Sequence, residues 1–359
     1  MRLAFTHAYC WPEVRRGAER YTQELGAALA ARGHDVTILS SGWDPTDSTL
    51  DGVRTVRLRR FREHGYGHEA DFGRRVLPRL LAGRFDVVHS LGRRDALASI
   101  RAARLRTRRT VITDLGLPSR QWWDTVGREG TVVEQVVDGI DVYGCMSHYA
   151  LEFLARDYGR TDGVVLPGGV QTARFTPAAA RQPEPTLLFS GVLTEPRKGL
   201  ATLLEAVALI AATEPRVKLW LSGPGDPGEL LAAAAAAARD RTELLELGGP
   251  QDIHERYGRA WATVLPSTHD SFGMALVESL ACGTPLVVST HGAPKELVTE
   301  GVTGELCEPG DAAGLAEACL RAFALATDPS SGTVEACRES AAPFDWQALA
   351  AAAEAHYAG

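Results

Sequence analysis

The feature that most constrains the fold is a unit of apolar run, loop and helix that recurs in both halves of the chain. In the first half, a candidate strand at residues 3–9 precedes a helical pattern at 18–33, and another apolar run follows at 35–41. In the second half, an apolar run at 186–193 leads through a turn to a helical pattern at 200–212. Such units build parallel sheets that bind ligands at the carboxyl ends of their strands. The repetition therefore predicts an α/β protein.

Other segments of the sequence predict further strands, a loop, a helix and a linker. Other short apolar runs predict strands at residues 53–60, 85–90, 109–114, 141–147, 163–167, 217–223, 242–249, 262–267 and 285–290. The glycine-punctuated residues 62–75 predict an irregular loop, and residues 229–240 predict a helix. The Pro- and Ala-rich segment 176–185 is typical of a linker. A chain of 359 residues is therefore expected to form one domain at 1–175 and another at 186–335.

Two acids eight residues apart, Asp270 and Glu278, flank the glycine that opens a predicted helix. The helix should begin near Gly273, so that Met274, Ala275 and Glu278 share one face. Free amides at a helix start attract anions and carboxylates accept from hydroxyls, which suits a ligand with phosphate at one end and a polyol at the other. A nucleotide sugar has this shape. The alternative is that Asp270 only caps the helix and Glu278 is a solvated surface acid.

The segment around these acids, PSTHDSFGMALVESLACGTPLVVS (266–289), resembles the acid-x7-Glu signature of family 4 glycosyltransferases. These are retaining enzymes of the GT-B fold, and the family usually has Glu where Asp270 stands. The resemblance implies two Rossmann-like domains facing an interdomain cleft, with the donor nucleotide on the second domain and the acceptor mainly on the first. It also implies that the last segment, 336–359, packs back on the N-terminal domain.

Two glycine-containing loops are candidates for the donor phosphates. Gly17 stands at a helix entry where backbone can approach a phosphate. By resemblance this is the family's Gly-Gly loop, with Arg16 in place of the first glycine, although a plain helix-entry turn is the alternative. The sequence SGVLTEPRKG (190–199) resembles the family's phosphate-binding element, in which Gly191 precedes an Arg and a Lys precedes a second glycine.

Lys198 matches the lysine of that element, whereas Val192 stands where the Arg is expected. A diphosphate needs cations or amides to neutralise it, so Arg197 or Arg16 is expected to supply what Val192 does not. The alternative is that Lys198 is an ordinary surface lysine.

The run Gly223-Pro-Gly225-Asp-Pro-Gly228 also follows a strand and precedes a helix. It has the form of the dinucleotide fingerprint, which keeps an NAD(P)-dependent oxidoreductase as a rival class. Two prolines remove amide donors from this loop, which counts against that class. By resemblance, Gly223 and Gly225 border the nucleotide base.

The resemblance also suggests roles in catalysis. It implies that Asp270 holds hydroxyls of the donor sugar, that Glu278 accepts from the ribose and that Lys198 with the amides of Gly17 and of 272–275 (Phe272, Gly273, Met274 and Ala275) stabilises charge on the leaving phosphate. Most members have a His that contacts the sugar, and Leu115 stands in its place here. Neighbouring Asp114 is expected to take over part of that task. No metal, cofactor or protein nucleophile is implied.

The acceptor is expected to contact aromatic residues of the first domain: Tyr66, Trp122 and Trp123. The alternative for the Trp pair is core packing. A small specialised metabolite is preferred over a membrane lipid because no basic amphipathic helix stands out, and the arginines at 101–109 are interpreted as a solvated helix end.

Composition narrows the remaining classes. A net charge of −7 without interleaved basic and aromatic residues does not favour nucleic-acid binding. Six cysteines without CxxC or zinc-like spacing indicate reduced, buried thiols, and no metal site is visible. No membrane-span-length apolar run or leader pattern is seen, so a cytoplasmic protein is expected. A sugar-nucleotide epimerase and a non-catalytic sugar-nucleotide binder stay open, as do the base, the sugar and the oligomeric state.

Overall fold

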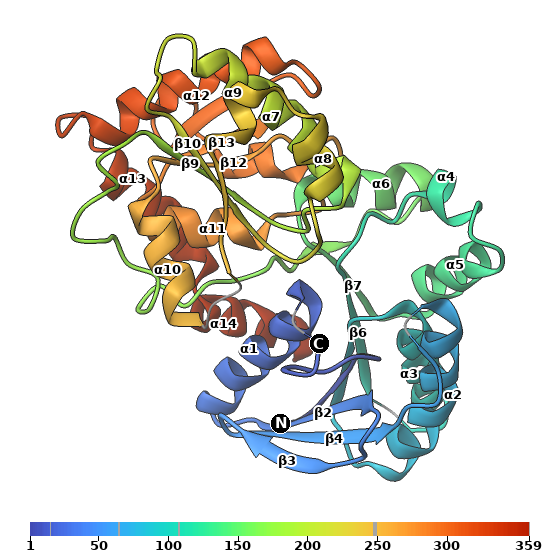
Figure 1. Cartoon of the computed structure of the whole chain (residues 1–359). Helices are drawn as coiled ribbons and strands as arrows, with labels where there is room; N and C mark the ends of the chain where they lie inside the picture. Colours follow the sequence, from blue (N-terminus) through green and yellow to red (C-terminus); the bar gives the residue numbers. More distant parts are fainter. Residues whose placement is uncertain (15, 64, 107, 247–249, 359) are drawn as a thin grey trace. The chain divides into compact units, whose positions relative to one another are not determined.

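The structure is a computed structural model that describes residues 1–14, 16–63, 65–106, 108–246 and 250–358 (Figure 1). The chain forms two compact units. The first unit comprises Met1–Gly169 together with Trp346–Gly359, and the second comprises Val170–Asp345. Each unit is built on its own sheet, and each is described by itself.

The first unit contains an eight-stranded sheet with the order β3-β4-β2-β1-β5-β6-β7-β8. All neighbouring strands are parallel except the edge pair β3 and β4. The strands are β1 (Arg2–Thr6), β2 (Asp35–Gly42), β3 (Asp47–Leu50), β4 (Val53–Arg59), β5 (Val87–Ser90), β6 (Arg109–Asp114), β7 (Val142–Cys145) and β8 (Val164–Val165). The chain reverses its direction of winding between β1 and β5, so their adjacent carboxyl ends form the switch point where doubly wound sheets bind ligands.

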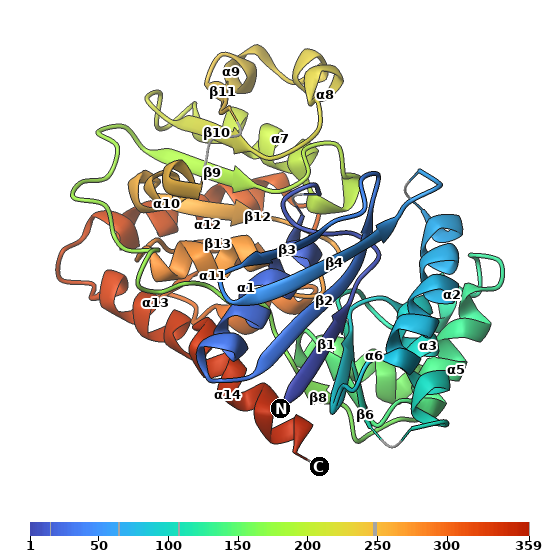
Figure 2. The ribbon, with the colours of Figure 1, turned by 90° about the horizontal axis from the view of Figure 1, so that it is seen from below.

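Helices cover both faces of this sheet (Figures 1 and 2). The helices α1 and α14 contact each other on one face, and α2, α3 and α5 follow one another across the other face. The helices of the unit are α1 (Gly17–Ala31), α2 (Tyr66–Ala82), α3 (Arg93–Ala103), α4 (Arg120–Trp123), α5 (Glu129–Gly139), α6 (His148–Tyr158) and α14 (Trp346–Tyr357).

The prediction of an irregular loop at 62–75 is wrong from Tyr66 onward, because α2 begins there. Phe72, Val76 and Leu80 are spaced by four residues and fully buried, so their helical periodicity outweighs the low helix propensity of the glycines. Packing explains why a glycine stands at position 73, since a Cβ there would lie 2.7 Å from the carbonyl oxygen of Arg94 at the start of α3. The glycine thus permits the close contact of α2 with α3.

The C-terminal helix α14 is fixed to the first unit by polar contacts at both of its sides. Buried His89 on β5 has Nδ1 at 2.7 Å from the Tyr357 hydroxyl and Nε2 at 2.7 Å from Thr113 Oγ1. Burial lowers the pKa of His89 to about 3, so the imidazole is neutral. Glu354 accepts from Arg32 Nε at 2.7 Å.

The second unit contains a six-stranded, fully parallel sheet with the order β11-β10-β9-β12-β13-β14. The strands are β9 (Thr186–Ser190), β10 (Lys218–Ser222), β11 (Thr242–Leu244), β12 (Ala262–Leu265), β13 (Leu286–Ser289) and β14 (Gly304–Cys307). The α-helices are α7 (Leu200–Ile210), α8 (Gly228–Ala233), α9 (Ala236–Arg239), α10 (Pro250–Arg259), α11 (Met274–Ala281), α12 (Ala312–Thr327) and α13 (Thr333–Ala341). Both units are therefore Rossmann-like.

Some predicted segments differ in detail from the structure of the second unit. The helix predicted at 229–240 is divided into α8 and α9, because Ala234 adopts an extended conformation. Of the strand predicted at 242–249, residues 247–249 lie outside the described part. Residues 176–185 lie on the second unit, where Arg181 donates to the carbonyl oxygens of Ala260 (2.6 Å) and Gly283 (2.8 Å).

Candidate functional site

The predicted donor residues of the second unit follow three neighbouring parallel strands. Lys198 comes after β9, Gly223 and Gly225 come after β10, and Asp270 comes after β12. Since β10, β9 and β12 are adjacent in the sheet, their carboxyl ends lie at one edge. The chain thus brings these residues to the edge where α/β sheets hold ligands.

A charge cluster forms at this edge. Lys198 Nζ donates to Asp270 Oδ2, and Arg197 Nη1 lies 3.5 Å from the other carboxylate oxygen. Arg197 also donates to the carbonyl oxygen of His269 at 2.8 Å, while the Thr268 amide donates to the Arg197 carbonyl at 2.9 Å. These contacts tie the Lys198 turn to the loop after β12. Asp270 is 6% exposed, so its charge is balanced chiefly by these two cations.

Three glycines let the surrounding loops approach closely. At Gly199 and at Gly223 a Cβ would overlap a backbone carbonyl oxygen, that of Pro266 and that of Gly191 respectively. At Gly225, a Cβ would lie 2.8 Å from Thr194 Oγ1. All three have positive φ. Gly191 has no such crowding, and its nearest neighbour would be Phe189 at 3.8 Å.

The helix α11 begins one residue after Gly273, whose φ is 107°. Its first turn is closed by the Leu276 amide, which donates to the Gly273 carbonyl at 2.9 Å. The preceding amides of 272–275 have no acceptor inside the helix, as at every helix start. The Phe272 ring is buried 5.6 Å from that of Phe344, which fixes the entry to the helix. Glu278 is buried in the second turn, at 3% exposure.

In the first unit, Gly17 opens α1 as predicted, and Arg16 precedes it. The Arg16 guanidinium does not point freely to solvent: Nη2 donates to Glu19 Oε1 at 2.9 Å, and it lies 4.8 Å from the Tyr9 ring centroid. Burial raises the pKa of Glu19, but hydrogen bonds and charges from His7 and Arg16 prevail and lower it to about 2. Arg16 is thus held beside the start of α1 by an ionised carboxylate.

A cavity of about 290 Å³ lies in the first unit at the carboxyl ends of β1, β5 and β6, and we call it the switch-point cavity. The predicted residues Tyr66, Asp114 and Trp123 line it, together with Leu115. Trp122 does not line the cavity and is 60% exposed. Of the Trp pair, therefore, Trp123 is placed at the cavity and Trp122 is on the surface.

Asp114 is enclosed by donors. Arg93 Nη2 lies 2.6 Å from both of its oxygens, the Tyr143 hydroxyl donates to Oδ2 at 2.7 Å and the Gly116 amide donates to Oδ1 at 3.1 Å. The Arg93 guanidinium in turn lies 3.8 Å from the centroid of the Trp123 ring. This arrangement positions Arg93 against Trp123. It leaves Asp114 little capacity to accept a hydrogen bond from a substrate hydroxyl.

Sequence reasoning did not single out several residues that line the switch-point cavity: His7, Glu69, Arg93, Asp95 and Glu129. His7 directly follows β1, and Arg93 and Asp95 begin the helix that follows β5. A search of the polar residues just after each predicted strand would have found these three. Glu69 was hidden because its helix was interpreted as a loop.

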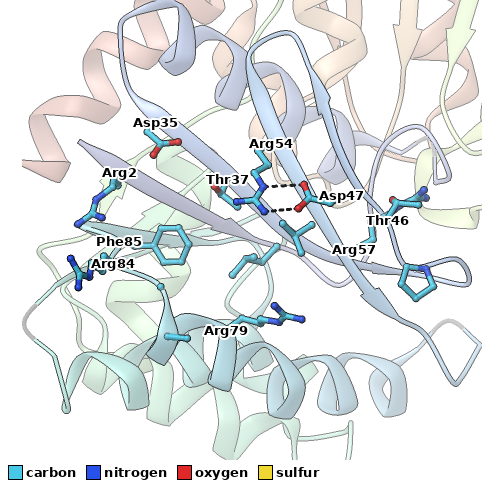
Figure 3. Close-up of a pocket in the computed structure, with 15 residues that line it drawn as sticks. Arg2, Asp35, Thr37, Thr46, Asp47, Arg54, Arg57, Arg79, Arg84 and Phe85 are labelled. Carbon is cyan, nitrogen blue, oxygen red and sulfur yellow. Dashed lines mark hydrogen bonds and ion pairs between the residues drawn. The ribbon is translucent and has the colours of Figure 1, made fainter.

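A larger hollow, of about 670 Å³, lies on the same unit between α2 and the sheet (Figure 3). We call it the arginine hollow because five arginines line it: Arg2, Arg54, Arg57, Arg79 and Arg84. Figure 3 shows Arg54 in a two-pronged contact with Asp47, at 2.9 and 2.5 Å, so part of this charge is neutralised. None of the predicted site residues lines this hollow.

Within residues 1–358, apart from the gaps named above, no group of three or more His, Cys, Asp or Glu side chains is arranged to hold a metal ion. Among the helices in the described part of the chain, none combines the length and the apolar character needed to cross a membrane.

Comparison with known proteins gives matches along almost the whole chain. The family model described as Glycosyltransferase Family 4 matches residues 15–174, and the model described as Glycosyl transferases group 1 matches residues 184–324. A glycogen synthase of Mycobacterium tuberculosis is 31% identical over 95% of this chain and 90% of its own length. A phosphatidyl-myo-inositol mannosyltransferase of Mycolicibacterium smegmatis is 27% identical, with coverages of 98% and 92%.

Solved structures share the fold. A sucrose-phosphate synthase from Thermosynechococcus elongatus superposes with a TM-score of 0.86 at 23% identity, over 99% of this chain and 98% of that one. Anabaena HepE in complex with UDP-glucose gives a TM-score of 0.77 at 16% identity, over 99% of both chains. At these identities the likeness establishes the architecture, two Rossmann-like domains of the GT-B type, and no more.

Proposed function

The chain belongs to the family 4 and group 1 glycosyltransferases, and we propose that it moves a sugar from a nucleotide diphospho-sugar to a small-molecule acceptor with retention of anomeric configuration. The observation that carries this proposal is the Lys198–Asp270 pair at the ends of β9 and β12, next to the start of α11. In this pair, the Lys198 ammonium can bind a donor phosphate, and the Asp270 carboxylate can accept hydrogen bonds from sugar hydroxyls. Similar proteins support the donor class, since HepE was solved with UDP-glucose.

The proposed roles follow from charge. As the bond between the anomeric carbon and the phosphate oxygen breaks, negative charge develops on the leaving phosphate. Lys198, Arg197 and the amides at the start of α11 can stabilise that charge, because they are fixed before the reaction and need little reorganisation. Glu278 is proposed to accept from the ribose. Because cationic side chains of the protein neutralise the donor phosphates, a metal ion is not required, and transfer is expected to persist in EDTA.

The proposed step conserves atoms and charge. An acceptor hydroxyl oxygen forms a bond to the anomeric carbon on the face from which the nucleoside diphosphate departs, which retains the configuration. The proton of that hydroxyl passes to the leaving phosphate oxygen. Asp270 holds sugar hydroxyls during this step, and no covalent enzyme intermediate is formed. A small acceptor, of the specialised-metabolite type, is proposed on the strength of the compact switch-point cavity.

A thermal-shift panel of UDP-, GDP-, ADP- and dTDP-sugars tests the donor class directly. A shift with one nucleotide sugar that is smaller in Lys198→Ala supports the proposal, with the exposed Lys218→Ala on β10 as matched control. Transfer with the identified donor is then followed by NMR of the product's anomeric proton. No shift with any nucleotide sugar, or a product of inverted configuration, contradicts the proposal.

A further inference from the structure

The switch-point cavity differs from an ordinary polyol site in its charge. Four carboxylates line it, those of Glu69, Asp95, Asp114 and Glu129. Arg93 is the guanidinium that lines the cavity, and it is committed to Asp114 at 2.6 Å. Glu129 is paired with Arg94 on the adjoining turn of α3. The pairing therefore accounts for two carboxylates and leaves Glu69 and Asp95.

Neither of these two acids forms an ion pair with a residue that the structure describes, although the charge of His7 acts on both of them. Asp95 is 2% exposed, and its Oδ2 accepts from Thr6 Oγ1 at 2.6 Å and from the Gly92 amide at 3.4 Å. The Glu69 carboxylate makes no hydrogen bond or ion pair with any residue that the structure describes, and the Glu69 amide donates to the Gly65 carbonyl. Burial raises the pKa of both, that of Asp95 to about 7 with the Thr6 hydrogen bond opposing the rise. Their ionised forms are costly as they stand, and a ligand that brings positive charge relieves that cost.

His7 adds a buried imidazole to the lining of the same cavity. Its ring is 8% exposed and lines the cavity, and its Nε2 lies 3.3 Å from Glu19 Oε1. Its other nitrogen, Nδ1, is buried without a hydrogen-bond partner among the described residues. Glu19 accepts from both His7 and Arg16 and does not line the cavity, so its carboxylate is not one of the cavity acids.

Other residues that line the cavity are aromatic or apolar. Trp123 is 8% exposed and is held edge-on to Tyr66 at 6.2 Å between ring centroids. Leu91 and Leu115 complete the apolar lining. An aromatic face packs against the carbon face of a saturated ring, while the acids accept from its substituents. A volume of about 290 Å³ is at the lower end for ligand pockets, so it suits a single ring.

We propose that this cavity selects, as acceptor, a cyclic polyol that carries a protonated amine, and that it rejects phosphorylated acceptors. The inference rests on the proposed function. The ammonium group is placed against Glu69 and Asp95, and the carbon face of the ring against the lining formed by Tyr66, Leu91 and Leu115. A phosphate in the same place meets two unpaired acids and no uncommitted guanidinium from the lining.

Calorimetric titration of the full-length protein with matched probes tests this selectivity. D-glucosamine, D-glucose and D-glucose 6-phosphate share a ring and differ in charge, as do scyllo-inosamine, myo-inositol and myo-inositol 1-phosphate. In at least one set, the amine is expected to bind about tenfold more tightly than the neutral ring, with the phosphate weakest. In Glu69→Gln and in Asp95→Asn, this preference should fall to about threefold or less.

The control variant is Glu63→Gln, which removes an exposed acid just before α2 that does not line the cavity. It should keep the full preference. Equal or tighter binding of a neutral or phosphorylated probe, binding of none of the six, or an unchanged preference in both cavity variants overturns the inference. Affinity for the nucleotide sugar is measured in the same samples, because its loss would refute the proposed function, whereas loss of amine preference alone refutes only the acceptor class.

Discussion

Replacing Gly223 by Ala should separate the loops that follow β9 and β10 in the second unit, where we propose that the donor binds. The φ angle of Gly223 is 153°, and a Cβ would overlap the carbonyl oxygen of Gly191 and lie 2.7 Å from its carbonyl carbon. Two backbone hydrogen bonds hold these loops together, from the Gly191 amide to Ser222 O at 2.9 Å and from the Leu193 amide to Pro224 O at 2.8 Å. Because the neighbouring atoms are backbone, the clash is relieved only if the loops separate.

The expected cost follows from these contacts. Holding Ala at an unfavourable φ costs about 1 to 3 kcal/mol. Losing the two hydrogen bonds adds about 0.5 to 1.5 kcal/mol for each. The Gly223→Ala variant should therefore lose about 2 to 6 kcal/mol of unfolding free energy in urea denaturation. The Kd for the nucleotide sugar, measured by titration calorimetry under native conditions, should rise as well.

Gly191→Ala is the matched control, because it lies on the other side of the same contact. Its φ is not positive, and the nearest atom to a Cβ would be on the Phe189 ring at 3.8 Å. The control should change the unfolding free energy by about 0.5 kcal/mol or less. If Gly223→Ala is as stable as Gly191→Ala, the close approach of these two loops does not exist as described.

Three further outcomes are expected. Lys198→Met should raise the donor Kd by about 10- to 100-fold, since a charge-assisted bond contributes about 1.5 to 3 kcal/mol; an unchanged Kd in calorimetry would contradict this role. Arg93→Met leaves Asp114 buried without its cation and should cost about 3 to 5 kcal/mol in urea denaturation. Adding Asp114→Asn should recover part of that loss, and its failure to do so would exclude the pairing. Asp95, with a folded pKa of about 7 against 3.8, binds its proton more tightly when folded. The wild-type stability should therefore fall, relative to Asp95→Asn, as the pH rises from about 4 to about 7 and level off above, whereas a constant difference would contradict the raised pKa.

The fold could be predicted from local signals because each strand of a parallel sheet is a short apolar run between loops. The strand expected at 109–114 is β6, residue for residue, and that at 53–60 is β4 with one residue fewer. The edge strand β3 was missed, since DSTL has neither apolar alternation nor burial. Its pairing with β4 depends on the hairpin and not on its own composition.

The gathering of the predicted donor residues at one edge of the second sheet could also be predicted from the sequence, because these residues follow strands that any parallel sheet brings to one edge. The switch-point cavity was not visible. Glu69, Asp95 and Glu129 come from three helices that are separate in the chain, and only packing brings them together. The contact of α2 with α3 depends on Gly73, because a side chain there would clash with the carbonyl of Arg94, twenty-one residues later in the chain. Local periodicity contains no such information.

Leu115, which stands where most members of the family have a His, lines the switch-point cavity and changes its polarity. In the family that the chain resembles, a His is usual there, and a His can donate a hydrogen bond or carry positive charge. Leu115 removes that donor from a cavity in which Glu69 and Asp95 form no ion pair with a residue that the structure describes. Asp114 does not replace the missing group, because Arg93, Tyr143 and the Gly116 amide occupy its oxygens. The net effect makes the cavity more acidic, which is the condition under which an amine on the acceptor, in place of a basic side chain, supplies the compensating charge.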